Sequence, residues 1–204
     1  MIDYTLVFYL ILTYLITSIP FGYIVGKIFG KDVTKEGSGN IGATNVARTI
    51  GKKAGALVLF LDALKGYIPV KYAQEYFFYN SKYIMLVAIV AIIGHCFSIF
   101  MKFKGGKGVA TGFGVLIALS VKTALIVFLF WLGVFLVSGY VSLASIMASS
   151  ISWIVLFYIE KDFYLSVAAF IVSLIIVYKH SSNIERLLKG TENRFLYKAK
   201  IKED

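Results

Sequence analysis

The chain has 204 residues, of which 59% are hydrophobic, and it carries a formal net charge of +10. Together with a mean hydropathy of +0.80, this composition excludes an ordinary soluble domain and indicates a membrane protein. One cysteine and two histidines exclude a disulfide framework and argue against a zinc site, so no metal or other cofactor is expected. The basic residues lie between apolar stretches, which favours membrane orientation and anionic ligands over nucleic acid.

Seven apolar stretches are long enough, or nearly long enough, to cross a bilayer. They occupy about residues 4–29, 54–72, 83–100, 109–120, 123–138, 141–159 and 163–178. The first begins without a basic leader and is too long for a signal peptide, so it is expected to be a retained span. The stretch 109–120 is short, and is expected to be a half-helix or to extend over the preceding glycines. The prediction is an all-α integral membrane protein with seven transmembrane helices in one domain, residues 1–204.

The lysines and arginines predict how these helices are oriented. If the N-terminus lies outside, segments 30–53, 102–108 and 179–204 lie inside and carry most of the positive charge. The outside segments then carry only Lys71, Lys82, Lys122 and Lys161. The positive-inside rule therefore places the C-terminus in the cytoplasm and makes these three segments cytoplasmic.

The first cytoplasmic segment combines glycines with short polar side chains before a single arginine. Glycines let the backbone approach a ligand closely, and free N–H groups can then bind an anion. The residues expected to bind phosphate in this way are Gly37, Ser38, Gly39, Asn40, Gly42, Thr44 and Asn45. Arg48 lies one helical turn beyond Thr44, and its planar guanidinium can bind two phosphate oxygens. The alternative is a flexible loop that merely caps the next helix, but so many glycines and amides beside an arginine favour an anion site.

The second cytoplasmic segment is a basic, glycine-rich stretch directly before an apolar helix. Lys104, Gly105, Gly106 and Gly108 are expected to contribute to phosphate binding, and Lys107 to reach the same anion as a compact charge. The spacing is not that of a Walker A loop, because Gly108 follows Lys107. The alternative is a basic turn that only sets topology, and Lys102 fits that description.

The third cytoplasmic segment leaves the membrane at Tyr178. His180 and Asn183 are three residues apart and share a face if this segment is helical, so they can meet one ligand together. The alternative for His180 is an interfacial polar group without a catalytic role. Residues 180–185 also come near the H-x-x-x-x-D box of one class of glycerolipid acyltransferases, but Glu185 replaces the aspartate and the match is attributed to coincidence.

Several polar residues lie within the apolar stretches themselves. Asp62 and Lys65 are three apart, and charges at that depth must pair or line a hydrated cavity, so a structural ion pair or a substrate role is expected. Two serines, Ser142 and Ser145, either face the site or make helix contacts. His95 and Cys96 are expected to pack in the interior.

Six motifs in series give the chain a family resemblance. They are residues 18–27 (SIPFGYIVGK), 37–45 (GSGNIGATN), 62–66 (DALKG), 105–111 (GGKGVAT), 180–184 (HSSNI) and 190–192 (GTE). In this order, over nearly the whole chain, they resemble the PlsY family of acyl-phosphate:glycerol-3-phosphate acyltransferases. The resemblance implies an enzyme of the bacterial inner membrane, with its active site facing the cytoplasm, that converts acyl phosphate and glycerol 3-phosphate to lysophosphatidate and phosphate. The leading catalytic candidates are then Ser38, Arg48, Lys107, His180, Asn183 and Glu192.

Two other classes of protein compete with this interpretation. An organic-phosphate transporter also uses broken helices with glycine-rich ends, but it would place them near mid-membrane rather than at cytoplasmic ends. A CDP-alcohol phosphotransferase would need clustered aspartates for metal, and Asp32 and Asp62 are isolated from each other in the sequence. The acyltransferase interpretation requires that the three cytoplasmic segments meet in one pocket.

Overall fold

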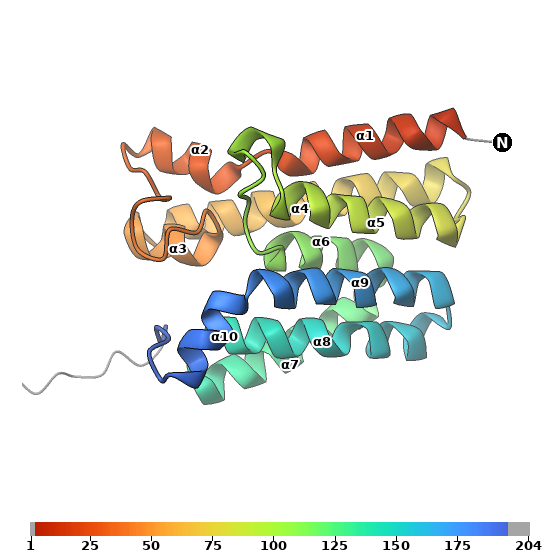
Figure 1. The fold of residues 1–204 in the computed structure, drawn as a ribbon. Coiled ribbons are helices and arrows are strands. Elements are labelled where there is room, and N and C mark those ends of the chain that lie inside the picture. Colours follow the sequence, from red (N-terminus) through yellow and green to blue (C-terminus); the bar gives the residue numbers. More distant parts are fainter. Residues whose placement is uncertain (1–2, 196–204) are drawn as a thin grey trace, which may run out of the picture.

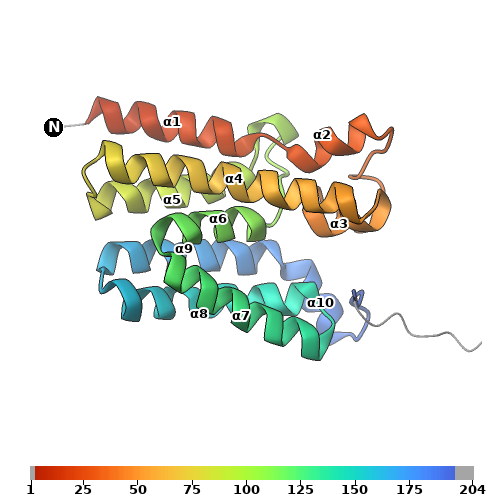
Figure 2. The ribbon, with the colours of Figure 1, turned by 180° about the vertical axis from the view of Figure 1, so that it is seen from behind.

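The computed structural model describes residues 3–195, and every regular element in that range is helical. The helices are α1 (Tyr4–Ser18), α2 (Phe21–Ile28), α3 (Ala43–Thr49), α4 (Lys52–Tyr76), α5 (Ser81–Cys96), η1 (Ile99–Met101), α6 (Val109–Leu119), α7 (Val121–Ser138), α8 (Val141–Glu160), α9 (Phe163–Lys179) and α10 (Ser181–Leu188). The long helices run along one common direction, while α2, α3 and α10 lie together at one end of the bundle (Figure 1). The chain begins at the opposite end, which the reverse view confirms (Figure 2).

Length and composition identify several of these helices as candidate membrane spans. Four segments qualify outright: Tyr4–Ile28, Ser81–Met101, Val121–Ser138 and Val141–Glu160. A fifth is formed if the bent pair of α9 and α10 counts as one span. The predicted stretches 54–72 and 109–120 form α4 and α6, which do not qualify by this measure. Asp62 and Lys65 lie in the middle of α4, and α6 has only 11 residues.

The first apolar stretch is interrupted where a continuous helix was expected. It divides into α1 and α2 at Ile19 and Pro20, because proline has no N–H to donate and disfavours helical geometry in the residue before it. At the break the carbonyl of Ile19 accepts from the Phe21 N–H at 3.1 Å and from the Lys65 ammonium at 2.6 Å.

The helix α6 is a half-helix, which decides between the two alternatives for this stretch. It begins at Val109, directly after Gly108 with φ +84°, and does not extend over the preceding glycines. Its close approach to α4 depends on glycine, because a Cβ at Gly114 would collide with the Ala63 carbonyl and one at Gly66 with the Thr111 carbonyl. Small residues of this kind are how helices pack inside membranes, where lipid offers no hydrophobic drive for association.

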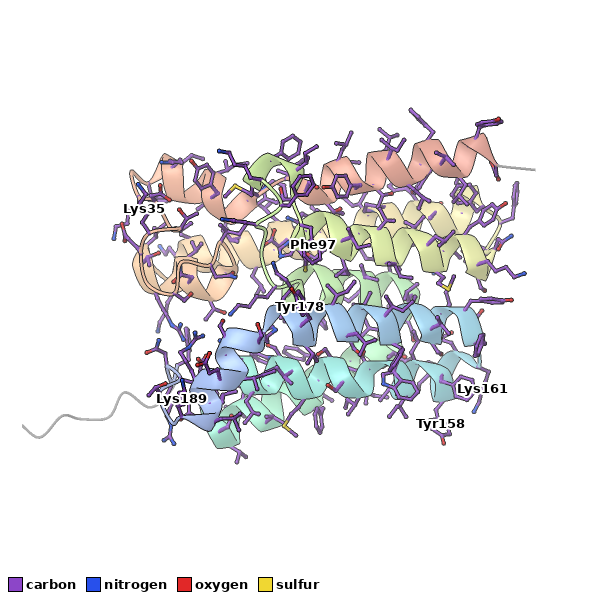
Figure 3. All side chains as sticks on the ribbon, in the orientation of Figure 1. Lys35, Phe97, Tyr158, Lys161, Tyr178 and Lys189 are labelled. Atoms are coloured by element: carbon purple, nitrogen blue, oxygen red, sulfur yellow. The ribbon has the colours of Figure 1, made fainter. Side chains whose placement is uncertain are left out.

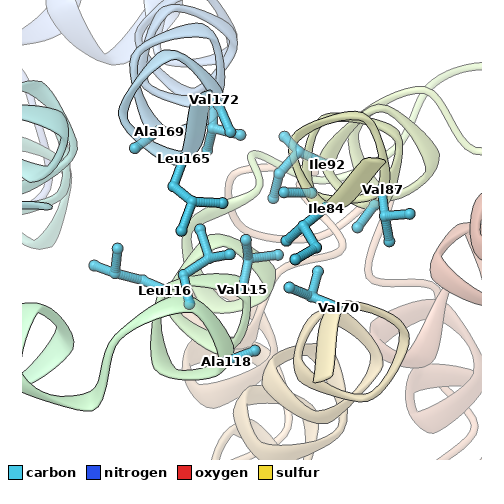
Figure 4. Close-up of a cluster of buried hydrophobic side chains, with 14 of the residues drawn as sticks. Val70, Ile84, Val87, Ile92, Val115, Leu116, Ala118, Leu165, Ala169 and Val172 are labelled. Atoms are coloured by element: carbon cyan, nitrogen blue, oxygen red, sulfur yellow. The ribbon is translucent and has the colours of Figure 1, made fainter. Parts of the chain in front are cut away.

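The larger apolar core lies between α4, α5, α6 and α9 (Figure 4). Side chains from all four helices meet there, among them Val70, Ile84, Val115 and Leu165. Outside this core, many large apolar side chains are exposed on the bundle, as expected of a surface that faces lipid. Lys35 and Lys189 lie at the end that carries α3 and α10, whereas Lys161 lies at the other end, with its ammonium 5.2 Å from the Tyr158 ring (Figure 3).

Candidate active site

The three predicted cytoplasmic segments converge on one polar cavity of about 360 Å³. Every leading catalytic candidate lines it: Ser38, Arg48, Lys107, His180, Asn183 and Glu192. The lining also includes the predicted binding residues Asn40, Gly42, Thr44 and Asn45. The geometric requirement set by the sequence, that distant polar segments meet at one end of the bundle, is therefore met.

The first loop is held in shape by the buried side chain of Asn45. Its Nδ2 donates to the carbonyls of Val33 and Glu36, each at 3.0 Å, and its Oδ1 accepts from the Ser38 N–H at 2.8 Å. Gly37, at φ +61°, passes so close that a Cβ there would collide with Asn45 Oδ1. Asn45 therefore fixes the loop that presents Ser38 to the cavity.

The end of this loop starts α3, which carries Arg48. Gly42 precedes the helix and donates its N–H to Asn40 Oδ1 at 2.7 Å, while Gly39 turns the chain at φ +68°. Arg48 lies in the last turn of α3 and donates to the Asn193 carbonyl at 3.3 Å. Partial burial lowers the pKa of Arg48, an effect that the charge of Glu192 opposes; a guanidinium stays protonated at neutral pH all the same.

The second loop brings Lys107 to the wall of the cavity. The N–H groups of Gly105 and Gly106 donate to the carbonyls of Cys96 and His95, each at 3.2 Å. The loop is thereby fixed to the end of α5, and Lys107 donates to Asn183 Oδ1. Burial lowers the pKa of Lys107 from 10.5 to about 8, although the nearby Glu192 carboxylate opposes this shift.

Not every predicted phosphate-binding residue lies on the cavity wall. Gly37, Gly39, Gly105, Gly106, Gly108 and Lys104 are absent from its lining. The glycines shape the two loops from behind, and Gly108 packs beside Cys96. Lys104 is exposed.

His180 lies between α9 and α10, with its ring buried at the cavity. Its Nδ1 is 2.8 Å from the Ile176 carbonyl, and because a carbonyl can only accept, Nδ1 carries the hydrogen and Nε2 the lone pair. Burial lowers the pKa of His180 to about 4, with the Lys107 charge acting in the same direction. The imidazole is therefore neutral at neutral pH, with Nε2 available as an acceptor.

Glu192 connects α10 to α8 through a set of hydrogen bonds. Its Oε1 accepts from Asn183 Nδ2 at 2.7 Å and Ser142 Oγ at 2.8 Å, and its Oε2 accepts from Arg186 Nε at 2.6 Å. Burial acts to raise the pKa of Glu192, but these donors outweigh it and the pKa lies below its ordinary value. Sequence reasoning missed Arg186, although it is three residues beyond Asn183 and shares its helix face.

The charged residues within α4 form the expected ion pair. Lys65 Nζ lies 2.8 Å from Asp62 Oδ1, and both side chains are almost fully buried. His95 was expected only to pack, but it hydrogen-bonds Thr111 at 3.0 Å and, like Asp62, lines the polar cavity. Cys96 is buried as expected.

A second cavity, of about 600 Å³, adjoins the polar one and is almost entirely apolar. Both cavities are lined by Ala56, Leu59, Val109, Ala110, Trp131 and Ser145, so the two spaces are neighbours across a shared wall. The Trp131 indole also donates to Ser145 at 3.1 Å. Among the described residues 3–195, no group of three or more His, Cys, Asp or Glu side chains could hold a metal ion.

A helical membrane fold with a cationic cavity beside an apolar one suits a membrane protein that binds an anionic group next to an apolar chain. Comparison with known proteins identifies the family. Residues 7–190 match the sequence profile of the family described as Glycerol-3-phosphate acyltransferase, and the chain belongs to that family.

Relatives align along nearly the full chain. The glycerol-3-phosphate acyltransferase of Aquifex aeolicus is 46% identical over 188 residues, which cover 92% of this chain and 98% of the relative. That of Fusobacterium nucleatum is 44% identical over 191 residues, covering 93% and 97%. The crystal structure of PlsY (YgiH), an integral membrane glycerol 3-phosphate acyltransferase, in its glycerol 3-phosphate form matches with a TM-score of 0.91 and 45% identity, covering 94% of this chain and 96% of that one. Its lysophosphatidic acid form matches with a TM-score of 0.88. These likenesses confirm the predicted acyltransferase and integral membrane fold against the transporter and phosphotransferase alternatives.

Proposed function

We propose that this chain transfers a fatty acyl group from acyl phosphate to the 1-hydroxyl of glycerol 3-phosphate, giving lysophosphatidate and phosphate. The observation that carries the proposal is the pair of adjoining cavities, one cationic and one apolar, with a shared wall at Val109, Ala110 and Trp131. A headgroup bound by Arg48 and Lys107 would then have space for its acyl chain directly beside it. The PlsY structures in glycerol 3-phosphate and lysophosphatidic acid forms support the same acceptor and product.

We further propose that the polar end faces the cytoplasm of a bacterial cell, in its inner membrane, with seven crossings and the N-terminus outside. The lysine and arginine distribution supports this orientation, and so does the start of the chain at the end of the bundle opposite α3 and α10 (Figure 1). The Asp62–Lys65 ion pair lowers the cost of placing the charged helix α4 across the membrane.

Acyl phosphate is a mixed anhydride with a good leaving group, so the reaction does not require a covalent acyl-enzyme. The ester bond forms between the glycerol oxygen and the acyl carbon as the bond from that carbon to the bridging phosphate oxygen breaks. Phosphate leaves with the electron pair. Both substrates are anionic, and Arg48 and Lys107 offset their repulsion in a partly dehydrated site where charge interactions are stronger than in water.

The hydroxyl proton has two candidate acceptors, His180 Nε2 and a phosphate oxygen of the substrates. The pKa of His180 is lowered to about 4, whereas a phosphate monoester has a second pKa of about 6. The phosphate is thus the stronger base, and we assign the proton to it. His180 then orients the glycerol group through Nε2, and Ser38 donates a hydrogen bond to a substrate rather than acting as a nucleophile.

The test is an assay of the purified protein with synthetic acyl phosphate and glycerol 3-phosphate, beside acyl-CoA under the same conditions. Phosphate release in step with lysophosphatidate formation, with acyl phosphate alone as donor, is the expected result. Equal turnover with acyl-CoA would overturn the donor assignment. A stable acyl group trapped on Ser38 would contradict direct transfer.

A further inference from the structure

A buried polar network lies beside the loop that carries Lys107, and two of its members, Asp62 and His95, also line the polar cavity. Within it, Asp62 and Lys65 of α4 form an ion pair, and Lys65 also donates to the Ile19 carbonyl at the break between α1 and α2. His95 Nδ1 lies 3.8 Å from Asp62 Oδ1 and hydrogen-bonds the fully buried Thr111 hydroxyl at 3.0 Å. Polar groups at this depth are costly to bury, so a network that links α4, α5, α6 and the break between α1 and α2 calls for a role beyond packing.

His95 touches the glycine loop with both its backbone and its ring. Its carbonyl accepts from the Gly106 N–H at 3.2 Å. Gly106 also packs closely against the imidazole, since a Cβ there would collide with Nε2 and come within 2.9 Å of Cε1. The position of the His95 ring therefore decides where Gly106 lies, and Lys107 is the next residue.

We propose that His95, held by Thr111 and backed by the Asp62–Lys65 ion pair, is a positioning residue that sets the glycine loop so that Lys107 meets its substrate phosphate. This role rests on the proposed assignment of Lys107 to the phosphate site. The proposed role of the ring is to hold the loop rather than to take part in the transfer itself. The His95 ring packs against Gly106 and so limits where the loop can lie. The hydrogen bond to the Thr111 hydroxyl fixes the orientation of the ring.

The experiment compares Thr111→Val with Thr111→Ser. Valine keeps the shape of the buried side chain but removes the hydroxyl, whereas serine keeps the hydroxyl. We expect Thr111→Val to lower kcat/KM for glycerol 3-phosphate by up to about 100-fold, the scale of a 1 Å misplacement, and Thr111→Ser to restore most of it. The alkaline limb of the rate profile should also move up in Thr111→Val, because a displaced Lys107 is better hydrated while still facing Glu192, Arg186, Arg48 and Lys179. Wild-type rates and profile in Thr111→Val would overturn the proposal.

A second pair of variants decides the matter if Thr111→Val does not fold. Gly106→Ala places a methyl group against the His95 ring and should be nearly inactive, while adding His95→Ala makes room for that methyl group. Partial recovery in the double variant supports the proposal, and no recovery refutes it. Lys107→Ala separates the assignment of Lys107 to the phosphate site from the positioning role of His95. Normal activity in Lys107→Ala refutes the site assignment. Loss of activity in Lys107→Ala, with no effect of the Thr111 and Gly106 variants, refutes only the positioning role.

Discussion

The charge of Lys107 should control activity in the alkaline range. Burial lowers its pKa from 10.5 to about 8, so in the free enzyme the ammonium is lost as the pH rises through about 8. We expect kcat/KM to fall along that limb. A bound phosphate dianion favours the charged lysine, so the corresponding limb of kcat should lie at higher pH.

The lowered pKa of Lys107 also makes it possible to tell a loss of activity caused by deprotonation from one caused by unfolding. Lowering a lysine pKa from 10.5 to about 8 corresponds to roughly 3 kcal/mol of unfavourable burial, fully present below pH 8. Between about pH 8 and 10.5 the unfolded chain holds more protons than the folded one at this residue, so its contribution to stability rises with pH. Activity should therefore fall over an interval in which the titration of Lys107 makes the folded state more stable rather than less.

The assay is initial-rate kinetics from pH 6 to 10, with thermal unfolding in detergent measured on the same samples. Lys107→Ala should lose about 100-fold to 1,000-fold in kcat, as removal of one charge-stabilising donor does elsewhere. Lys102→Asn is the matched control, because Lys102 is an exposed lysine of the same segment whose φ of +51° asparagine tolerates. Near-normal turnover of Lys107→Ala, or an alkaline limb unchanged by it, would refute the reasoning.

Four further predictions follow from the cavities. Arg48→Ala should lose about 100-fold in kcat/KM while Arg48→Lys recovers only part, because a point charge cannot replace two parallel donors. Glu192→Gln should move the alkaline limb of the rate profile to lower pH than in the wild type, since the Glu192 charge raises the pKa of Lys107; an alkaline limb at unchanged pH would argue against this coupling. Ala148→Leu, in the apolar cavity, should favour shorter acyl phosphates by roughly fourfold per methylene lost, at about 0.8 kcal/mol each, as competition between chain lengths would show. The acid limb of kcat should follow phosphate near about pH 6 and persist in His180→Gln.

The sequence predicts the helices well because lipid leaves the backbone few options. A chain in hydrocarbon must satisfy its own N–H and C=O groups, so apolar stretches become helices, and most predicted boundaries agree with the structure within a few residues. Pro20 was the exception. The proline itself can be read from the sequence. Because apolar residues flank it on both sides, the stretch was predicted as one span and the break between α1 and α2 was not.

Arg48 and Lys107 could be predicted from the sequence as cations of the cavity, but the hydrogen bonds that hold the loops around them could not. Asn45 is indistinguishable from a ligand in the sequence, whereas in the structure its amide joins loop carbonyls to the Ser38 N–H. Ser142 and Glu192 are 50 residues apart along the chain and meet only because α8 begins close to the segment that follows α10. Nothing in local spacing encodes such contacts, because they depend on how whole helices pack.

Glu192 is an acidic residue in the cavity that we propose binds two anionic substrates, and its effect on the neighbouring charges bears on why it is there. Burial and the neighbouring Arg48 and Arg186 all push Lys107 toward losing its proton, and Glu192 acts against them. Without Glu192, the pKa of Lys107 would lie lower and less of the lysine would be charged near neutral pH. Glu192 offsets the Arg186 charge at 2.6 Å and favours the charged form of Lys107, so the carboxylate preserves that cation while adding one negative charge to the cavity.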